Sequence, residues 1–203
     1  PDGAIVLDIM ELTAEALSVR GRAGFAAGRF ETFDLAQVRG GENDFAVTGT
    51  VGEEGAITAA ISGAKLDLRG PAEKAKPGPR ENLLPDIKVP LDLRFDLGEM
   101  RIAESAPLLR ARGFARFDGT YWDSVAIEAT AGEAPLRFDY TRQDETRRAL
   151  KIETQDGGAA LAALGLYENA RGGALLITGT SAPSGEGRMT TGRFEFTNFK
   201  VVG

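Results

Sequence analysis

Residues 153–202, ETQDGGAALAALGLYENARGGALLITGTSAPSGEGRMTTGRFEFTNFKVV, place one short helix signal among extended apolar runs. Asp156 is suited to an N-cap, because its carboxylate can accept hydrogen bonds from the free amides of the next turn. Ala159–Leu164 are strong helix formers, and Gly165 can adopt the left-handed conformation that ends a helix. The stretch therefore predicts one short helix, near residues 157–164, in a chain that otherwise alternates like strands.

Extended runs lie on both sides of this helix. Gly172 and Gly173 allow positive φ before the apolar run Ala174–Thr180, and an aromatic strand closes the stretch. Upstream, apolar residues alternate with charged ones in three runs: Leu91, Leu93, Phe95 and Leu97; Leu136, Phe138 and Tyr140; Leu150 and Ile152. A period of two predicts strands with one apolar and one charged face. The pattern favours a mainly β antiparallel meander that is wet on one side.

The first third of the chain has a similar pattern of extended runs, but its alternation is less regular. We expect extended runs at 4–10, 16–22, 28–38, 43–51 and 56–62, with 65–69 ending this half, and glycines lie between the later runs. Thr13–Glu15 could instead begin a helical turn. Gly52–Gly55 is a good hairpin loop between two of the runs.

A proline-rich segment separates two β halves. Residues 70–90 contain five prolines and no sustained periodicity, which indicates a linker or a surface loop because proline removes ladder donors. We therefore expect an N-terminal half, 1–69, and a C-terminal half, 91–203, that carries the helix. The chain starts without Met and stops directly after a strand, so we interpret it as a piece of a longer polypeptide.

Composition excludes several functional classes. The chain has 203 residues, no histidine, no cysteine and a formal net charge of −6. Nucleophiles of the Ser-His-Asp and Cys-His kinds, thiol redox centres and ordinary zinc sites are therefore excluded. An acidic balance without a basic tract argues against nucleic-acid binding. The longest apolar run, Ala159–Tyr167, has nine residues, whereas a membrane-spanning helix needs roughly 20.

No motif assigns a catalytic residue, a metal site or a cofactor. A Gly-Lys-Ser/Thr phosphate loop is absent, and the glycines at 21, 24 and 28 miss the dinucleotide spacing. The carboxylate pairs Glu53-Glu54 and Asp144-Glu145 fall in expected loop tips, where solvated turn residues explain them. We expect a protein that is not an enzyme.

The spacing of the C-terminal stretch resembles a known family. The run Asp156-Gly157-Gly158…Leu161…Leu164-Gly165…Gly172-Gly173 is similar to the C-terminal signature of AsmA-like, YhdP-type envelope proteins. The likeness is strongest over 90–202. The Asp-Gly-Gly opening departs from the acidic-Ala-Gly of the family and adds flexibility before the helix.

The resemblance implies a β-sheet curled into a trough, within a periplasmic protein anchored to the inner membrane by a segment outside this chain. Such a trough would carry phospholipid acyl chains between the two membranes and support lipid homeostasis of the outer membrane. Flanking segments of the same polypeptide would be its other partners, and membrane contact would lie outside the chain. No nucleic acid is expected.

Two sets of residues follow from this interpretation. The apolar groove would be lined by Leu93, Phe95, Leu136, Phe138, Leu150, Ile152, Ile177 and Phe196. Leu161 and Leu164 of the helix would form a cap or gate. The alternative is a closed β-sandwich, a structural or protein-binding module of the envelope whose apolar face is filled by its own side chains. A module that binds a protein by edge-strand addition also remains open.

Overall fold

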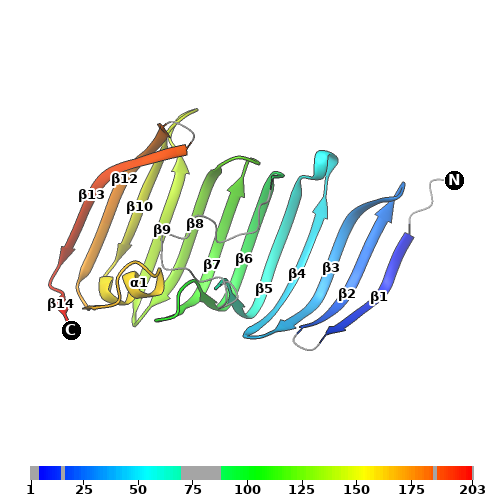
Figure 1. Ribbon diagram of the computed structural model, residues 1–203, viewed down its shortest axis with the longest axis horizontal. Coiled ribbons are helices and arrows are strands. Elements are labelled where there is room, and N and C mark those ends of the chain that lie inside the picture. The colour runs from blue at the N-terminus through cyan, green and yellow to red at the C-terminus, as the bar shows by residue number, and fades with distance from the viewer. Residues whose placement is uncertain (1–4, 15–16, 70–87, 185–186, 203) are drawn as a thin grey trace.

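The computed structural model describes residues 5–14, 17–69, 88–184 and 187–202, and it shows a single long sheet (Figure 1). Its strands are β1 (Ile5–Ala14), β2 (Leu17–Ala26), β3 (Arg29–Gly40), β4 (Asn43–Val51), β5 (Ile57–Asp67), β6 (Leu91–Arg101), β7 (Leu108–Phe117), β8 (Trp122–Ala131), β9 (Ala134–Arg142), β10 (Arg148–Thr154), β12 (Ala174–Ser184) and β13 (Gly187–Thr197). The remaining elements are the 3-10 turn η1 (Glu53–Gly55), the helix α1 (Gly157–Ala163) and a ribbon of β11 (Ala170–Arg171) with β14 (Lys200–Val201).

The sheet order follows the chain, so the fold is a meander. Each strand pairs with the next one in sequence, apart from β10, which pairs with β12 across α1 and β11. Every pairing in this sheet is antiparallel except that of β5 with β6. The sheet does not close, because β1 and β13 each pair on one side only. The mainly β prediction with one short helix is confirmed.

The expected halves belong to one sheet. Ile57, the first residue of β5, pairs with Leu91, the first residue of β6, so the two strands run in the same direction. Parallel neighbours require a connection longer than a hairpin, which suits the proline-rich segment between them. Of that segment, residues 70–87 lie outside the described residues.

Two expectations for the first third of the chain were wrong. Thr13 and Ala14 belong to β1, so no helical turn begins there, and Glu15 lies outside the described residues. The run 65–69 is not a separate element, because β5 continues to Asp67. A bulge explains the broken alternation: Phe45 pairs with Gly63 but Asp44 with Lys65, which leaves one extra residue on β5.

Helix α1 begins and ends with the capping interactions that its sequence predicted. The Asp156 Oδ1 atom accepts a hydrogen bond from the Ala159 amide at 3.1 Å. The helix ends one residue earlier than expected, at Ala163, with Leu164 as its C-cap. Gly165 has φ +69°, and the Leu166 amide donates to the Leu161 carbonyl, the closing bond of a Schellman motif. Gly172 and Gly173 both have positive φ, as the turn requires.

Candidate functional site

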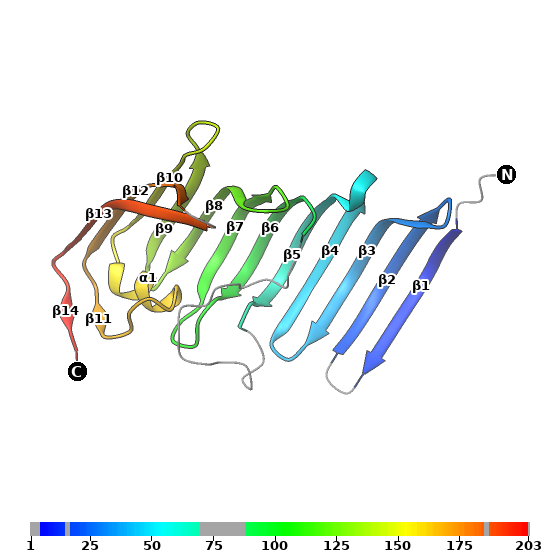
Figure 2. The ribbon, with the colours of Figure 1, turned by 45° about the horizontal axis from the view of Figure 1, so that its top comes forward.

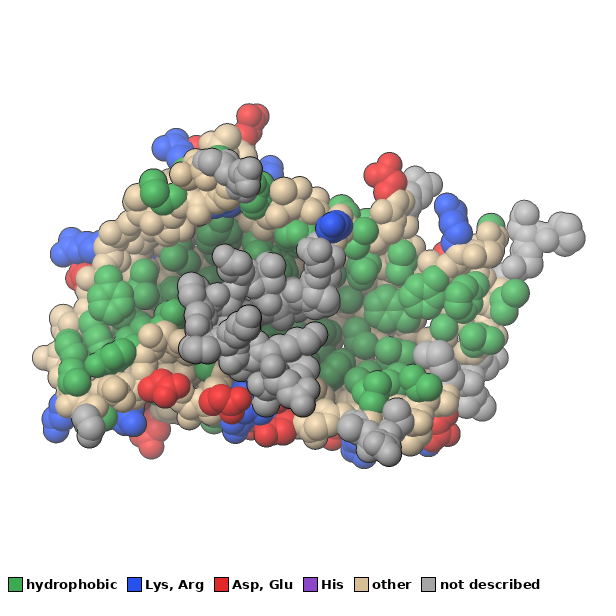
Figure 3. Space-filling model, in the orientation of Figure 1, with side chains coloured by type: hydrophobic (Ala, Val, Ile, Leu, Met, Phe, Trp, Pro, Cys, Tyr) green, Lys and Arg blue, Asp and Glu red, His purple; other side chains and the backbone are tan. Residues whose placement is uncertain are grey.

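One face of the sheet is apolar along almost its whole width. Residues paired in register across ten strands, β3 to β13, form what we call the central row: Leu35, Val47, Ile61, Phe95, Gly113, Ile127, Phe138, Ile152, Ile177 and Phe194. Figure 3 shows this apolar face, with hydrophobic side chains across it and charged side chains at its rims. The pattern of alternation therefore has one physical result, a continuous apolar surface.

All eight residues predicted to line a groove lie on this face. Phe95, Phe138, Ile152 and Ile177 belong to the central row, while Leu93 and Leu150 lie in the next row towards one rim, and Leu136 and Phe196 towards the other. Leu136 and Ile152 are buried, with 2% and 5% of their surface exposed. The other six are half-buried. The structure thus brings the set together, but two members pack as core.

Close packing of the aromatic rings on this face depends on a glycine. A methyl group on Gly113 would lie 3.0 Å from the tip of the Phe95 ring and 1.9 Å from the Ala126 carbonyl oxygen. The Phe95 ring therefore covers a position on the neighbouring strand that has no side chain. Gly113 keeps the central row continuous without raising a ridge across it.

Helix α1 covers one end of the apolar face. Leu161 is 5% exposed and packs in a cluster with residues of six strands and α1, namely Leu97, Met100, Leu108, Ala111, Ala129, Ala131, Leu136, Ile152, Ala160, Ala163 and Leu175. The helix is held close by the turn after it, because the amides of Gly157 and Gly158 donate to the carbonyls of Gly173 and Gly172 at 2.6 and 3.0 Å. Leu161 is thus a cap over this end.

Leu164 is less buried than Leu161, with which it was predicted to form the cap. It is the C-cap residue, it is half-buried, and it does not belong to that cluster. The Schellman turn that starts at Leu164 redirects the chain, so a residue three positions after Leu161 no longer follows the same helical face. The expected pair reduces to Leu161 as the buried contact.

The opposite end of the apolar face is polar. Arg148 occupies the same face of β10 as Leu150 and Ile152, yet it is 3% exposed. Its Nη2 atom donates to the Asp123 carboxylate at 2.9 Å, and Arg142, its partner on β9, donates to the same Asp123 oxygen from Nε at 2.9 Å. Sequence reasoning missed these residues. The signal was an arginine at the first position of an otherwise apolar alternating series, 148, 150 and 152.

The sheet curls at this end. Arg188, near the start of the edge strand β13, donates to the backbone carbonyl of Thr146 in the β9–β10 loop at 2.6 Å. Its guanidinium carbon lies 5.7 Å from the centre of the Tyr121 ring, next to the start of β8. These contacts join an edge strand to strands two and four positions away. Figure 2 shows the same bend of β12 and β13, so the apolar face lies in the hollow of the sheet.

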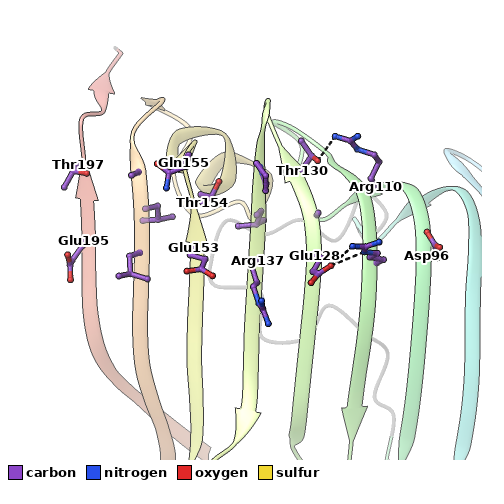
Figure 4. Close-up of a pocket in the computed structure, with 17 residues that line it drawn as sticks. Asp96, Arg110, Glu128, Thr130, Arg137, Glu153, Thr154, Gln155, Glu195 and Thr197 are labelled. Carbon is purple, nitrogen blue, oxygen red and sulfur yellow. Dashed lines mark hydrogen bonds and ion pairs between the residues drawn. The ribbon is translucent and has the colours of Figure 1, made fainter.

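The other face is a ladder of charges. Asp96, Arg112, Glu128, Arg137 and Glu153 are paired in register on five successive strands, so the sign of the charge alternates across the sheet. They line a shallow depression of about 1030 Å³, in which Arg112 donates to Glu128 at 2.8 Å (Figure 4). Opposite charges on neighbouring strands stabilise the pairing and keep this face solvated. We assign it a structural role.

The described residues contain no group of three acidic, histidine or cysteine residues that could hold a metal ion. Within the same ranges, no helix has the length and apolar character needed to cross a membrane. The arrangement is a hollow apolar face with a helix at one end and arginines at the other. Such a surface can bind an apolar chain.

Comparisons with known protein families, with curated proteins and with solved structures found no match for this chain.

Proposed function

We propose that the apolar face binds phospholipid acyl chains, and that the chain is a segment of a conduit for phospholipids between the inner and outer membranes. The observation that carries this proposal is an apolar face over which the described residues form no second layer. Among the described helices and strands, only η1, α1 and the β11–β14 ribbon lie outside the main sheet. Large uncovered apolar surfaces are rare in monomers and mark binding sites. The resemblance to the AsmA-like proteins supports the same function and a periplasmic location.

The energetics suit transport. Burial of an acyl chain contributes about 0.8 kcal/mol per CH₂ group. Because contacts between hydrocarbon and the side chains of the central row have no preferred direction, a bound chain keeps its affinity as it moves from one strand to the next. The open edges at β1 and β13 place no end wall across this path within the described residues.

Neighbouring residues of β9 provide a matched test. Phe138 belongs to the central row, whereas Asp139 points to the charged face and accepts a hydrogen bond from Arg137 Nε at 2.8 Å. A photo-crosslinking amino acid at position 138, in the envelope of a Gram-negative cell, should capture phospholipid. The same amino acid at 139 should capture far less. Equal capture at both positions, or none at 138 in a folded chain, would remove the proposal.

A protein-binding module without lipid is the second candidate, and the edge strand β1 favours it. Ile5, Val6 and Leu7 are 61%, 57% and 46% exposed, and β1 pairs only with β2. An unprotected edge of this kind can add a strand from another chain. Val6→Lys should then abolish association of this chain with its partner strand, measured by sedimentation, and should leave lipid capture at position 138 unchanged.

A further inference from the structure

The hollow of the sheet ends in three arginines, Arg142, Arg148 and Arg188, which we call the arginine cluster. Arg142 and Arg148 are cross-strand partners, and Ser181 pairs with Arg148 from the other side. Arg188 donates to the Ser181 hydroxyl at 3.2 Å and to its carbonyl at 2.8 Å. Arg142 and Arg148 share one row of the sheet with Ser181, and Arg188, which pairs with Pro183 in the next row outwards, reaches back to Ser181 on the same face as the central row.

The positive charge of this cluster is not balanced by the described residues around it. Within the described ranges, Asp123 is the one carboxylate that forms an ion pair with the cluster, and it is shared by Arg142 and Arg148. Arg188 has only neutral acceptors and the Tyr121 ring among the described residues. Like charges placed opposite each other destabilise a sheet. Two arginines paired in register, with a third beside them, are therefore a cost that folding alone does not explain.

Asp144, whose carbonyl accepts a hydrogen bond from Arg148 Nη1, has its carboxylate engaged in its own loop. Asp144 accepts hydrogen bonds from the backbone amides of Arg147 and Thr146 at 2.8 and 2.9 Å and from the Arg147 side chain. These bonds, the Arg147 amide first, lower the pKa of Asp144. Arg147 and Asp144 form a closed pair, which leaves the surplus charge on the arginine cluster.

One donor in the cluster, Arg148 Nε, has no acceptor among the described residues. Arg148 is 3% exposed, and its Nη atoms bind Asp123 and the carbonyls of Asp144 and Arg147. Its buried Nε has no hydrogen-bond partner within the described part of the chain. A buried guanidinium that is incompletely paired raises the local potential, and Arg142 and Arg188, which are less buried, present that potential at the rim.

We propose that the arginine cluster binds the phosphate of an anionic phospholipid whose acyl chains lie on the apolar face. This inference rests on the proposed function and adds to it the class of headgroup. Planar guanidinium groups match phosphate oxygens in bidentate geometry. The residues from Arg148 to Thr154, beside α1, span about 20 Å at about 3.3 Å per residue. One leaflet of a bilayer has about 15 Å of hydrocarbon, so a lipid held by its phosphate at the rim fits its chains between the arginines and the helix.

The chain carries its own reporter for this site. Trp122 is the one tryptophan of the sequence, and it lies between Tyr121 and Asp123. Its ring packs against Phe117 at a centroid distance of 5.3 Å. A headgroup that binds Arg142 and Arg188 should change the emission of Trp122, while calorimetry on the same samples gives the affinity.

The test compares two double variants of the full 203-residue chain. Arg142→Gln with Arg188→Gln removes two charges from the cluster and spares buried Arg148. Arg112→Gln with Arg137→Gln removes two charges from the opposite face. Dihexanoylphosphatidylglycerol, below its micelle concentration, should bind the first variant about tenfold or more weakly than wild type. It should bind the second variant as wild type does, and thermal melts should show that both are folded.

Two further probes separate the sources of phosphate and lipid. Inorganic phosphate alone should bind at least about tenfold more weakly than the lipid, because it gains nothing from the apolar face. Equal affinity for the two would overturn the lipid assignment of the cluster. Dihexanoylglycerol, which lacks phosphate, should bind wild type and the cluster variant equally. If dihexanoylphosphatidylglycerol also bound wild type and the cluster variant with equal affinity, the headgroup site would be wrong, whereas the proposed function would stand. Absence of binding by any lipid would remove both.

Discussion

Strands β1–β5 and strands β6–β13 share one apolar face, but within the described ranges only the second region carries a helix over it. Among the described residues of β1–β5, the buried apolar side chains are Ala23 and Ala59, and every other one lies between Leu97 and Leu175. Ile5, Leu12 and Phe30 are 61%, 56% and 40% exposed. The same alternation therefore yields an accessible surface in one region and a partly filled core in the other.

This difference shows that one short helix is enough to turn part of an exposed apolar sheet face into a buried core. A helix of seven residues, rich in alanine and glycine, lies close enough to the strands that Gly157 approaches the Phe196 ring. That contact and the burial of Leu161 convert one end of the face into core. Among the described residues, no other helix covers the rest of the face.

The largest effect should come from disrupting this cap. Leu161→Asp places a carboxylate among buried side chains and should lower the free energy of unfolding by about 3–5 kcal/mol. Leu12→Asp makes the same chemical change at a 56% exposed position of β1 and should change it by less than about 0.5 kcal/mol. Urea denaturation followed by circular dichroism measures both. Equal effects would show that the two regions do not differ in packing.

The close approach of α1 is the next point to test. A methyl group on Gly158 would lie 2.7 Å from the Ala170 carbonyl oxygen and from Arg171 Cα. Because both are backbone atoms, Gly158→Ala should destabilise by about 1–3 kcal/mol, despite the better helix propensity of alanine. Gly187 has no atom within 4 Å of that position, so Gly187→Ala is the matched control. A stable Gly158→Ala chain would mean that α1 can lift away from the sheet.

The N-cap should contribute less. Asp156→Ala removes the acceptor of the Ala159 amide and should cost about 1 kcal/mol of unfolding free energy. Asp156→Asn keeps an oxygen in place and should lose only part of this amount. Thermal melts of the two variants decide the matter, and an alanine variant as stable as wild type would indicate that water replaces the cap.

Acid should weaken the junction between the two regions slightly. Hydrogen bonds from Lys65 and Arg69 lower the pKa of Glu42, and those from Arg69 and Arg101 lower the pKa values of Asp67 and Glu99. A carboxylate with a depressed folded pKa stabilises the fold above its ordinary value, 4.5 for Glu and 3.8 for Asp. That stabilisation is lost as the pH falls through the folded pKa.

The measurement is the Tm as a function of pH below about 5, where these carboxylates begin to take up protons. Glu42→Gln should lower the Tm slightly at neutral pH and should reduce the loss on acidification. The effect should be the smallest of the four, because the Glu42 side chain is 47% exposed and its ion pairs are screened by solvent. A variant that loses as much Tm in acid as wild type would exclude Glu42 as a source of the pH dependence.

Local sequence patterns were enough to predict much of the fold. Period-two alternation in residues 91–97 and 136–140 defines the apolar and charged faces whichever strands become neighbours. The helix signal is local too, because the Asp156 cap and the positive φ of Gly165 act within a few residues of α1. The eight predicted groove residues share a face because alternate residues of a strand point to the same side of the sheet.

Tertiary structure alone decided how these pieces meet. The parallel pairing of β5 with β6 and the bulge at Gly63 depend on partner strands, and no local propensity encodes a partner. The position of α1 over the face divides the groove residues into the buried pair, Leu136 and Ile152, and the half-buried remainder. Arg188 meets Thr146 and Tyr121 only because the sheet curls, a property of many strands acting together. By itself the sequence determined an apolar face, whereas the curl and the helix determined where that face is a core and where it is a surface.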